Sequence, residues 1–242
     1  DLVRGEKLRR GEFGGMHGYM KIPELKRVCH AMEISINEYL VSVYIWSVYT
    51  ECLHGMPSKC PIRVAVPVNL RPYFNSITTK NFFVMVSAEF HPTKETYTFA
   101  EVAAIVKESL RSQINRENLE KLFSYNVSNE KLLIARVVPL FLKNLAMKYV
   151  YTTSALANTA TITNIGNISV TEEYRPYVEM FHAFLAMSKG QHLKGTICSY
   201  GDTLVFSFSY DLVDASVQRG FFRKIASDGI AVEIKSNGVN YE

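Results

Sequence analysis

The sequence lacks the short motifs with which several large enzyme classes bind phosphates or build a nucleophile. It contains no G-x-x-x-x-G-K-S/T loop and no G-x-G-x-x-G run, and the glycines near its start have the wrong spacing for either. Nucleotide-phosphate sites of those two kinds are therefore excluded. A G-x-S-x-G elbow is also absent, which argues against a serine hydrolase of that type.

Cysteine is scarce, and none of the 4 cysteines forms a C-x-x-C pair. Three of them lie in apolar runs, where a reduced thiol behaves as a small hydrophobic group, so we expect a reducing, cytoplasmic setting. Cys52, His54 and Cys60 have the chemistry of zinc ligands, but no fourth ligand follows at a recognisable spacing. We therefore expect no metal site.

Long uninterrupted apolar runs are missing too. The most apolar region, residues 132–150, contains Arg136, Pro139, Lys143 and Lys148, which is too much charge for a membrane span. Neither sign of charge is in large excess, since the sequence has 27 basic and 23 acidic residues. The basic residues are also scattered along the chain. This pattern predicts a mildly basic globular protein that binds no nucleic acid.

The 242 residues, 48% of them hydrophobic, suffice for a sizeable core. We expect residues 1–22 to be a glycine-rich linker and residues 23–242 to form one subdomain. Capping-box pairs, helical periodicity and alternating apolar residues predict the following elements: helices over 23–33, 35–53, 98–122, 130–150 (bent at Pro139) and 214–227, and strands over 61–70, 82–90, 159–168, 177–187, 193–200, 203–210 and 230–234. The fold class is α/β of the α+β type, with a mixed sheet covered by helices.

None of the histidines shows a catalytic context in the sequence. His17 falls in the expected linker and His192 precedes a hairpin, and neither has an evident orienting carboxylate. His182 is expected on a strand, as a core or edge residue, and His91 in a turn before a proline. We therefore assign no catalytic residue.

One ordered set of segments resembles a known family. It comprises the helix 38–50, Pro67-Val68-Asn69-Leu70-Arg71, Asn81-Phe82-Phe83, two long helices, Thr163-Asn164-Ile165-Gly166 and the final hairpin with its helix. Over residues 20–235 this order is similar to the carboxy-terminal half of the chloramphenicol acetyltransferase-like superfamily. Within it, the bacterial alcohol acetyltransferase-like and condensation-domain proteins are the most similar groups.

The resemblance implies one half of a two-lobed coenzyme A-dependent acyltransferase. In that family a tunnel between two α/β halves admits acyl-coenzyme A, or a carrier-protein thioester, and an alcohol or amine acceptor. The general base is the second histidine of a His-His-x-x-x-Asp-Gly motif on the amino-terminal half, and this sequence lacks the motif. We accordingly expect a missing amino-terminal half, consistent with a first residue that is not methionine, and an isolated chain that is inactive. No cofactor is expected to be bound permanently.

The resemblance also implies roles for individual residues. Arg71, together with Asn69, would support the active-site loop, since a family arginine at this position pairs with the aspartate of the histidine motif. The alternative for Arg71 is a strand-capping arginine that faces solvent. Asn81, Phe83, Thr163, Asn164 and Gly166 would line the tunnel, although Gly166 also fits an ordinary bulge.

Three functions remain open at this point. The first is acyl transfer, of acetyl in particular, from coenzyme A to an alcohol or amine. The second is a condensation-type domain that acts on carrier-protein thioesters, and the third is a non-catalytic binding or scaffold module of the same fold. If the other half is absent, we expect exposed apolar area and self-association through it.

Overall fold

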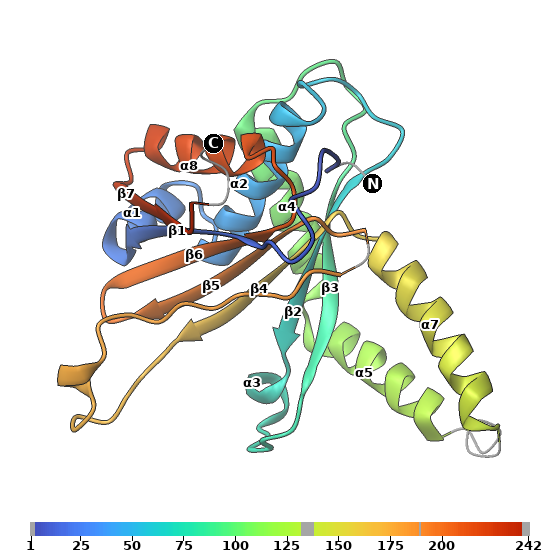
Figure 1. The fold of residues 1–242 in the computed structure, drawn as a ribbon. Coiled ribbons are helices and arrows are strands. Elements are labelled where there is room, and N and C mark those ends of the chain that lie inside the picture. The colour runs from blue at the N-terminus through green and yellow to red at the C-terminus, as the bar shows by residue number, and fades with distance from the viewer. Residues whose placement is uncertain (1–2, 132–137, 189, 239–242) are drawn as a thin grey trace.

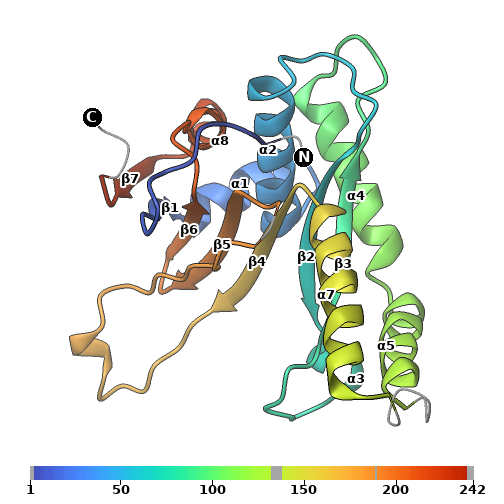
Figure 2. The ribbon, with the colours of Figure 1, turned by 45° about the vertical axis from the view of Figure 1, so that its right-hand side comes forward.

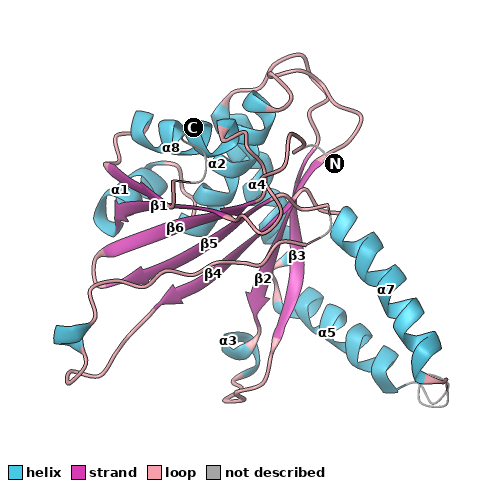
Figure 3. Cartoon of the chain, in the orientation of Figure 1, coloured by secondary structure: helices cyan, strands magenta, loops and turns pink. Residues whose placement is uncertain are grey.

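The computed structural model describes residues 3–131, 138–188 and 190–238. Figures 1 and 3 show its helices and strands, which follow one another in this order: β1 (Gly14–Lys21), α1 (Ile22–Ala31), α2 (Ile36–Glu51), β2 (Ile62–Asn69), α3 (Arg71–Phe74), β3 (Phe83–Phe90), α4 (Phe99–Gln113), α5 (Arg116–Lys131), α7 (Leu140–Leu156), β4 (Ala160–Asn167), the 3-10 turn η1 (Arg175–Tyr177), β5 (Leu193–Tyr200), β6 (Thr203–Tyr210), α8 (Ser216–Ser227) and β7 (Val232–Ser236).

The described residues form one seven-stranded sheet in the order β3-β2-β4-β5-β6-β1-β7. β4 runs parallel to β2 and β5, whereas the other neighbours are antiparallel. Helices α1, α2, α4 and α8 cover one face (Figure 2), and we call the opposite face the open face. This arrangement confirms the expected mixed sheet covered by helices.

Helix α2 forms the centre of the core. Its first turn is fixed by a capping box, in which the Glu38 amide donates to Ser35 Oγ at 3.1 Å and the Ser35 amide donates to Glu38 Oε2 at 2.7 Å. Most of its circumference is buried, against α4 and α8 among others. Because each fully buried large apolar side chain contributes about 1.5–3 kcal/mol, this helix anchors the layer that holds the sheet.

The expectation of a linker over residues 1–22 was wrong for Gly14–Lys21, which is strand β1 between β6 and β7. Close packing, and not a need for a flexible backbone, requires glycine at positions 14 and 18 of this strand. A Cβ atom on Gly14 or Gly18 would collide with the ring of Tyr210 or Phe222. The segment before β1 is attached as well, through backbone hydrogen bonds that join Leu8 to Asp211 and Val213 to Glu6.

The strand expected over residues 177–187 does not form. After η1 the chain crosses the open face without pairing along a strand, and hydrogen bonds to side chains hold it there. The Leu185 amide donates to Ser209 Oγ at 3.2 Å, and Lys194 Nζ donates to the Ala186 carbonyl at 2.8 Å. An apolar sequence that packs on a sheet face satisfies the same hydrophobic pattern as a strand, which explains the error.

The helical pattern over residues 98–122 divides into α4 and the first part of α5. The chain leaves helical geometry at Ile114, and Asn115 then accepts the Asn118 amide at 2.9 Å as a new cap. Pro139 directly precedes α7 instead of bending a helix, and the part of that prediction over residues 132–137 lies outside the described residues.

Helices α5 and α7 extend away from the sheet (Figures 1 and 2). A row on α7 stays exposed, with 63% of Leu145 and 72% of Tyr149 accessible to solvent. In the part of the chain that the structure covers, no helix combines the length and apolar character that a membrane crossing needs.

Candidate functional site

The main candidate site lies where the parallel strands β2 and β4 separate. They pair only at Val64↔Ala160 and Ala65↔Thr161. Beyond these residues β2 remains paired with β3, and β4 with β5. Figures 1 and 2 both show the two arrows pointing apart. The ends of β2 and β4 therefore offer backbone edges that do not pair with each other, and we call this region the β2–β4 opening.

Arg71 organises the turn at the end of β2. Its Nε donates to the Thr78 carbonyl at 2.8 Å and its Nη2 to the Lys80 carbonyl at 2.6 Å. The Asn69 side chain accepts both the amide and the Nη1 of Arg71, each at 3.1 Å. Within residues 3–131, 138–188 and 190–238 no acidic side chain forms an ion pair with Arg71. Arg71 thus supports its own loop directly.

The next two predicted residues lie beside this turn. Asn81 is exposed just before β3, and Phe83 opens β3 opposite Asn69 with 48% of its surface accessible. Met85, two residues further on the same face of β3, is 45% exposed. An exposed aromatic and a thioether side by side provide an apolar surface on this arm of the opening.

The remaining predicted residues lie on β4. Asn164 is exposed, its Oδ1 accepts the Gly166 amide at 2.9 Å, and its Nδ2 lies 3.5 Å from Asn37 Oδ1 at the start of α2. Gly166 has a φ of +85°, and the register with β5 shifts between Asn164 and Gly166. The positive φ and the register shift fit the bulge that was one of the two interpretations of Gly166.

The structure separates the predicted residues into two sets. Asn69, Arg71, Asn81 and Phe83 lie on the β2–β3 arm, while Thr163, Asn164 and Gly166 lie on the β4 arm. Free backbone amides and carbonyls together with exposed amide side chains can bind an extended molecule that carries its own amides. None of the predicted residues is a histidine or a carboxylate that could act as a general base.

A shallow basic depression lies beside the start of α2, the helix whose Asn37 contacts Asn164. Lys26, Arg27 and His30 of α1 line it, with Ile34, Ser35 and Ile36 below. The Arg27 guanidinium is partly engaged, since it donates to the Gly229 carbonyl at 2.9 Å. Basic residues one turn apart in the predicted helix 23–33 were the available sequence signal, but their position beside the start of α2 required the tertiary structure.

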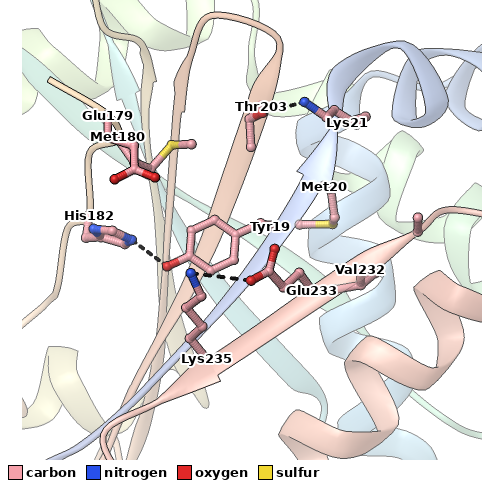
Figure 4. Close-up of a pocket in the computed structure, with 11 residues that line it drawn as sticks. Tyr19, Met20, Lys21, Glu179, Met180, His182, Thr203, Val232, Glu233 and Lys235 are labelled. Atoms are coloured by element: carbon pink, nitrogen blue, oxygen red, sulfur yellow. Dashed lines mark hydrogen bonds and ion pairs between the residues drawn. The ribbon is translucent and has the colours of Figure 1, made fainter. Parts of the chain in front are cut away.

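A second depression, with a volume of about 700 Å³, lies on the open face (Figure 4). It is lined by residues from β1, β6, β7 and the loop after η1: Tyr19, Met20, Lys21, Glu179, Met180, His182, Thr203, Ala231, Val232, Glu233 and Lys235. Tyr19 Oη lies 2.7 Å from His182 Nε2, and Lys235 is paired with Glu233 at 3.3 Å. Burial raises the pKa of Tyr19, so its phenol stays neutral at ordinary pH.

Two histidines meet beside this depression. The ring of His17, on β1, lies 4.4 Å from that of His182, centroid to centroid, and its Nδ1 is 2.8 Å from Ser207 Oγ. Burial, and then the nearby His182, lower the pKa of His17 to about 4. His17 is therefore a neutral residue of a central strand rather than an exposed linker residue, and His182 lies on a loop rather than a strand.

A polar row crosses the open face from β4 to β7. The strand register aligns Thr163 with Thr196, Thr196 with Ser207, Ser207 with His17, and His17 with Lys235. Thr196 Oγ1 is buried and has no hydrogen-bond partner among the described residues. The alternation of polar and apolar residues in β6 indicated such a face, but only the register joins these side chains in one line.

His192 does have a carboxylate partner, contrary to the sequence interpretation. Its Nδ1 lies 2.9 Å from Asp211 Oδ1, between the start of β5 and the end of β6. Because β4 and β5 are parallel, this pair lies at the opposite end of the strands from the β2–β4 opening. Over the described ranges, no group of three or more histidine, cysteine or acidic side chains could hold a metal ion.

Comparison of the fold with solved structures gives consistent similarities. The trichothecene 15-O-acetyltransferase TRI3 from Fusarium sporotrichioides matches with a TM-score of 0.59 and 14% identity, over 93% of this chain and 48% of TRI3. The epimerization domain TycB3(E) of tyrocidine synthetase B matches with a TM-score of 0.56 and 12% identity, over 94% and 50%. The nonribosomal peptide synthetase FmoA3 matches with a TM-score of 0.58 and 16% identity, over 94% and 23%.

The chain has the fold of the condensation and acyltransferase proteins. It spans half or less of the length of each of the three chains above. Comparison of the sequence with protein-family models and with curated proteins gives no match. At identities of 16% and below, the similarity concerns the fold of this condensation and acyltransferase group and not its substrates.

Proposed function

We propose that this chain is the carboxy-terminal half of an acyltransferase that moves an acyl group, in particular acetyl, from coenzyme A to an alcohol or amine. The observation that carries the proposal is the β2–β4 opening in a chain whose fold matches TRI3 and TycB3(E) over about half of their lengths. The other half would supply the general base and close the tunnel.

The β2–β4 opening suits a thioester arm. A pantetheine arm is extended and carries two amides, which match the free backbone edges and the amide side chains of Asn81 and Asn164. The exposed ring of Phe83 would contact the apolar parts of the arm. Arg71 and Asn69 would keep the turn rigid, so that this wall is formed before a substrate arrives.

The basic depression on α1 favours coenzyme A as donor over a pantetheine arm alone. Coenzyme A ends in phosphates, and phosphates bind where lysine and histidine side chains converge. Lys26 and His30 line the depression beside the start of α2, and Asn37 in the first turn of α2 contacts Asn164. In this arrangement the nucleotide end would rest on α1 while the thioester end enters the opening.

The activity test compares this chain with the full-length parent. Free coenzyme A released from acetyl-coenzyme A is measured with a panel of alcohols and amines. We expect turnover by the parent and none by this chain. Turnover by this chain equal to that of the parent would refute the proposal.

The donor test uses calorimetric titration of this chain with coenzyme A. Lys26→Ala and His30→Ala are expected to weaken binding about tenfold in combination, whereas Lys59→Ala, an exposed lysine elsewhere, leaves it unchanged. Pantetheine, which lacks both the nucleotide and the phosphates, is expected to bind equally to all variants. Binding of coenzyme A that ignores the α1 residues would argue against this donor site.

A second candidate is a condensation-type domain that acts on carrier-protein thioesters. The matches to TycB3(E) and FmoA3, both from peptide synthetases, favour it. Retention of a pantetheinylated carrier protein by the chain, with no binding of free coenzyme A, would select this candidate over the first.

The exposed row on α7 gives the proposed partner half, or a second copy, an apolar surface to cover. Sedimentation of the isolated chain at rising concentration should therefore reveal self-association. A strictly monomeric species at high concentration would contradict this expectation.

A further inference from the structure

A third depression lies on the helix-covered side of the sheet, between α8 and the edge strand β7. It has a volume of about 280 Å³. Its floor is apolar, made by Met16 and Phe222, which are 6% and 3% exposed, and its outer wall is made by Val232 and Ile234 of β7. We call it the α8–β7 groove.

The groove exists because β7 extends the sheet beyond its helical cover. Gly18 pairs with Ile234 and Met20 with Val232, so the apolar side chains of β7 point to the same side as the core residues of β1. Phe222 of α8 packs against Gly18, in the space that a Cβ atom on Gly18 would occupy. Ile234 is consequently left 48% exposed on the helix-covered side.

Two cations complete the groove. Arg219 and Arg223 lie one turn apart on α8 and both line it, whereas none of its lining residues is acidic. Arg219 has only a 4.0 Å contact with the exposed Asp214, and Arg223 has no ion pair in the described part of the chain. The charged residues of β7 do not compensate, because Glu233 and Lys235 point to the open face, where they line the other depression.

The alternative interpretation is that the two arginines only shield β7 with their aliphatic stems, as long basic side chains often do. Shielding alone would require neither a second arginine beside the groove nor a lining without acidic residues. Two guanidinium groups beside an apolar trough match an anion with an apolar tail, since a guanidinium pairs with carboxylate oxygens in a planar fork. The volume lies near the lower end of the range for small-molecule pockets.

We propose that the α8–β7 groove binds a small amphiphilic anion, with a carboxylate-type head between Arg219 and Arg223 and an apolar tail along Val232 and Ile234. This site is distinct from the β2–β4 opening, which lies on other strands, so it does not depend on the proposed acyl transfer. Free fatty-acid anions and the anionic heads of lipids share the required chemistry.

Titration of the chain with octanoate, followed by calorimetry and by the amide NMR signals of β7 and α8, tests the site. We expect saturable binding that Arg219→Gln combined with Arg223→Gln weakens at least about tenfold. Lys235→Gln, which removes one positive charge on the opposite face of β7, is expected to have no effect. Octanol, which has the same tail without the charge, should bind at least about tenfold more weakly.

Three outcomes would overturn the proposal: equal binding of octanoate and octanol, binding that is insensitive to the arginine variants, or binding only to phosphatidylglycerol vesicles with none of free octanoate. The last would assign the surface to a lipid bilayer. Binding of both octanoate and the vesicles, each lost in the arginine variant, would support the site and identify lipid as one source of the ligand. Unchanged melting temperatures of the arginine variants establish that the fold is intact.

Discussion

The ring of Phe222 occupies the space in which a side chain of Gly18 would begin. β1 and α8 are therefore in contact through a glycine. Gly18→Ala must displace the ring or the strand, and we expect a loss of about 2–3 kcal/mol of unfolding free energy, as for overpacked cores. Gly5→Ala, where a Cβ atom meets nothing within 4 Å, is the matched control. Thermal unfolding of the two variants measures the difference, and equal melting temperatures would contradict the packing.

Arg71 should act through the two carbonyls that it joins. We expect Arg71→Ala to loosen the β2–β3 turn and to accelerate amide hydrogen exchange across residues 70–82. Arg71→Lys should not restore protection, because an ammonium group does not present the planar fork that reaches both Thr78 and Lys80. Lys80→Ala removes a neighbouring charge but keeps the acceptor carbonyl, and it should exchange like the parent chain. Full protection in Arg71→Ala would show that the turn does not need this side chain.

His17 should make stability depend on pH. Its pKa falls from 6.5 in an unperturbed histidine to about 4, so the folded chain binds this proton less readily than the unfolded chain. The stability that the folded chain gains from keeping His17 neutral is fully present above pH 6.5 and is lost as the pH falls toward about 4. The full shift corresponds to about 3 kcal/mol, which we discount to about 1–2 kcal/mol for the partial exposure of the ring.

Urea unfolding at several pH values tests this expectation. His17→Gln should flatten the curve between pH 4 and pH 6.5, whereas His30→Gln, at an exposed position on α1, should leave its slope unchanged. A curve that keeps its slope in His17→Gln would assign the dependence to another group.

Glu38 links the cap of α2 to α4. It is 7% exposed, and its carboxylate accepts from Arg111 Nε at 2.7 Å and from the Ser35 amide at 2.7 Å. Burial by itself raises the pKa of Glu38, but the hydrogen bonds from Arg111 and Ser35 outweigh it and lower the pKa overall. Glu38→Gln should cost about 1–2 kcal/mol in chemical unfolding. Glu117→Gln, which breaks only the exposed pair with Lys121, should leave the midpoint unchanged, and equal effects of the two variants would contradict the role of Glu38.

Much of the fold follows from local pattern. The capping boxes at Ser35 and Thr98 are present, and the Gly201-Asp202 hairpin joins β5 and β6. These features depend on neighbours in sequence, so the printed residues suffice to predict them. The order of elements, on which the resemblance to the acyltransferases rests, can likewise be predicted from the sequence.

The site could be predicted only in part. The resemblance in the sequence suggested Asn69, Arg71 and Asn164 as candidates, but the sequence did not predict the divergence of β2 from β4 that sets them on separate arms. Lys26 and His30 gave no signal that placed them beside the start of α2, because that placement is decided by the tertiary structure. The polar row from Thr163 to Lys235 depends on strand register, which is fixed by pairing between distant segments.

The glycines of β1 show the difference between what the sequence predicts and what only the tertiary structure decides. The sequence by itself determined the helix starts at Ser35 and Thr98, the position of the hairpin turn and the absence of the histidine motif. Only the tertiary structure decided that Gly14 and Gly18 belong to a central strand, because their need for no side chain comes from the rings of Tyr210 and Phe222, almost two hundred residues or more away along the chain. Local propensity interprets such glycines as flexible, whereas packing requires them to be small.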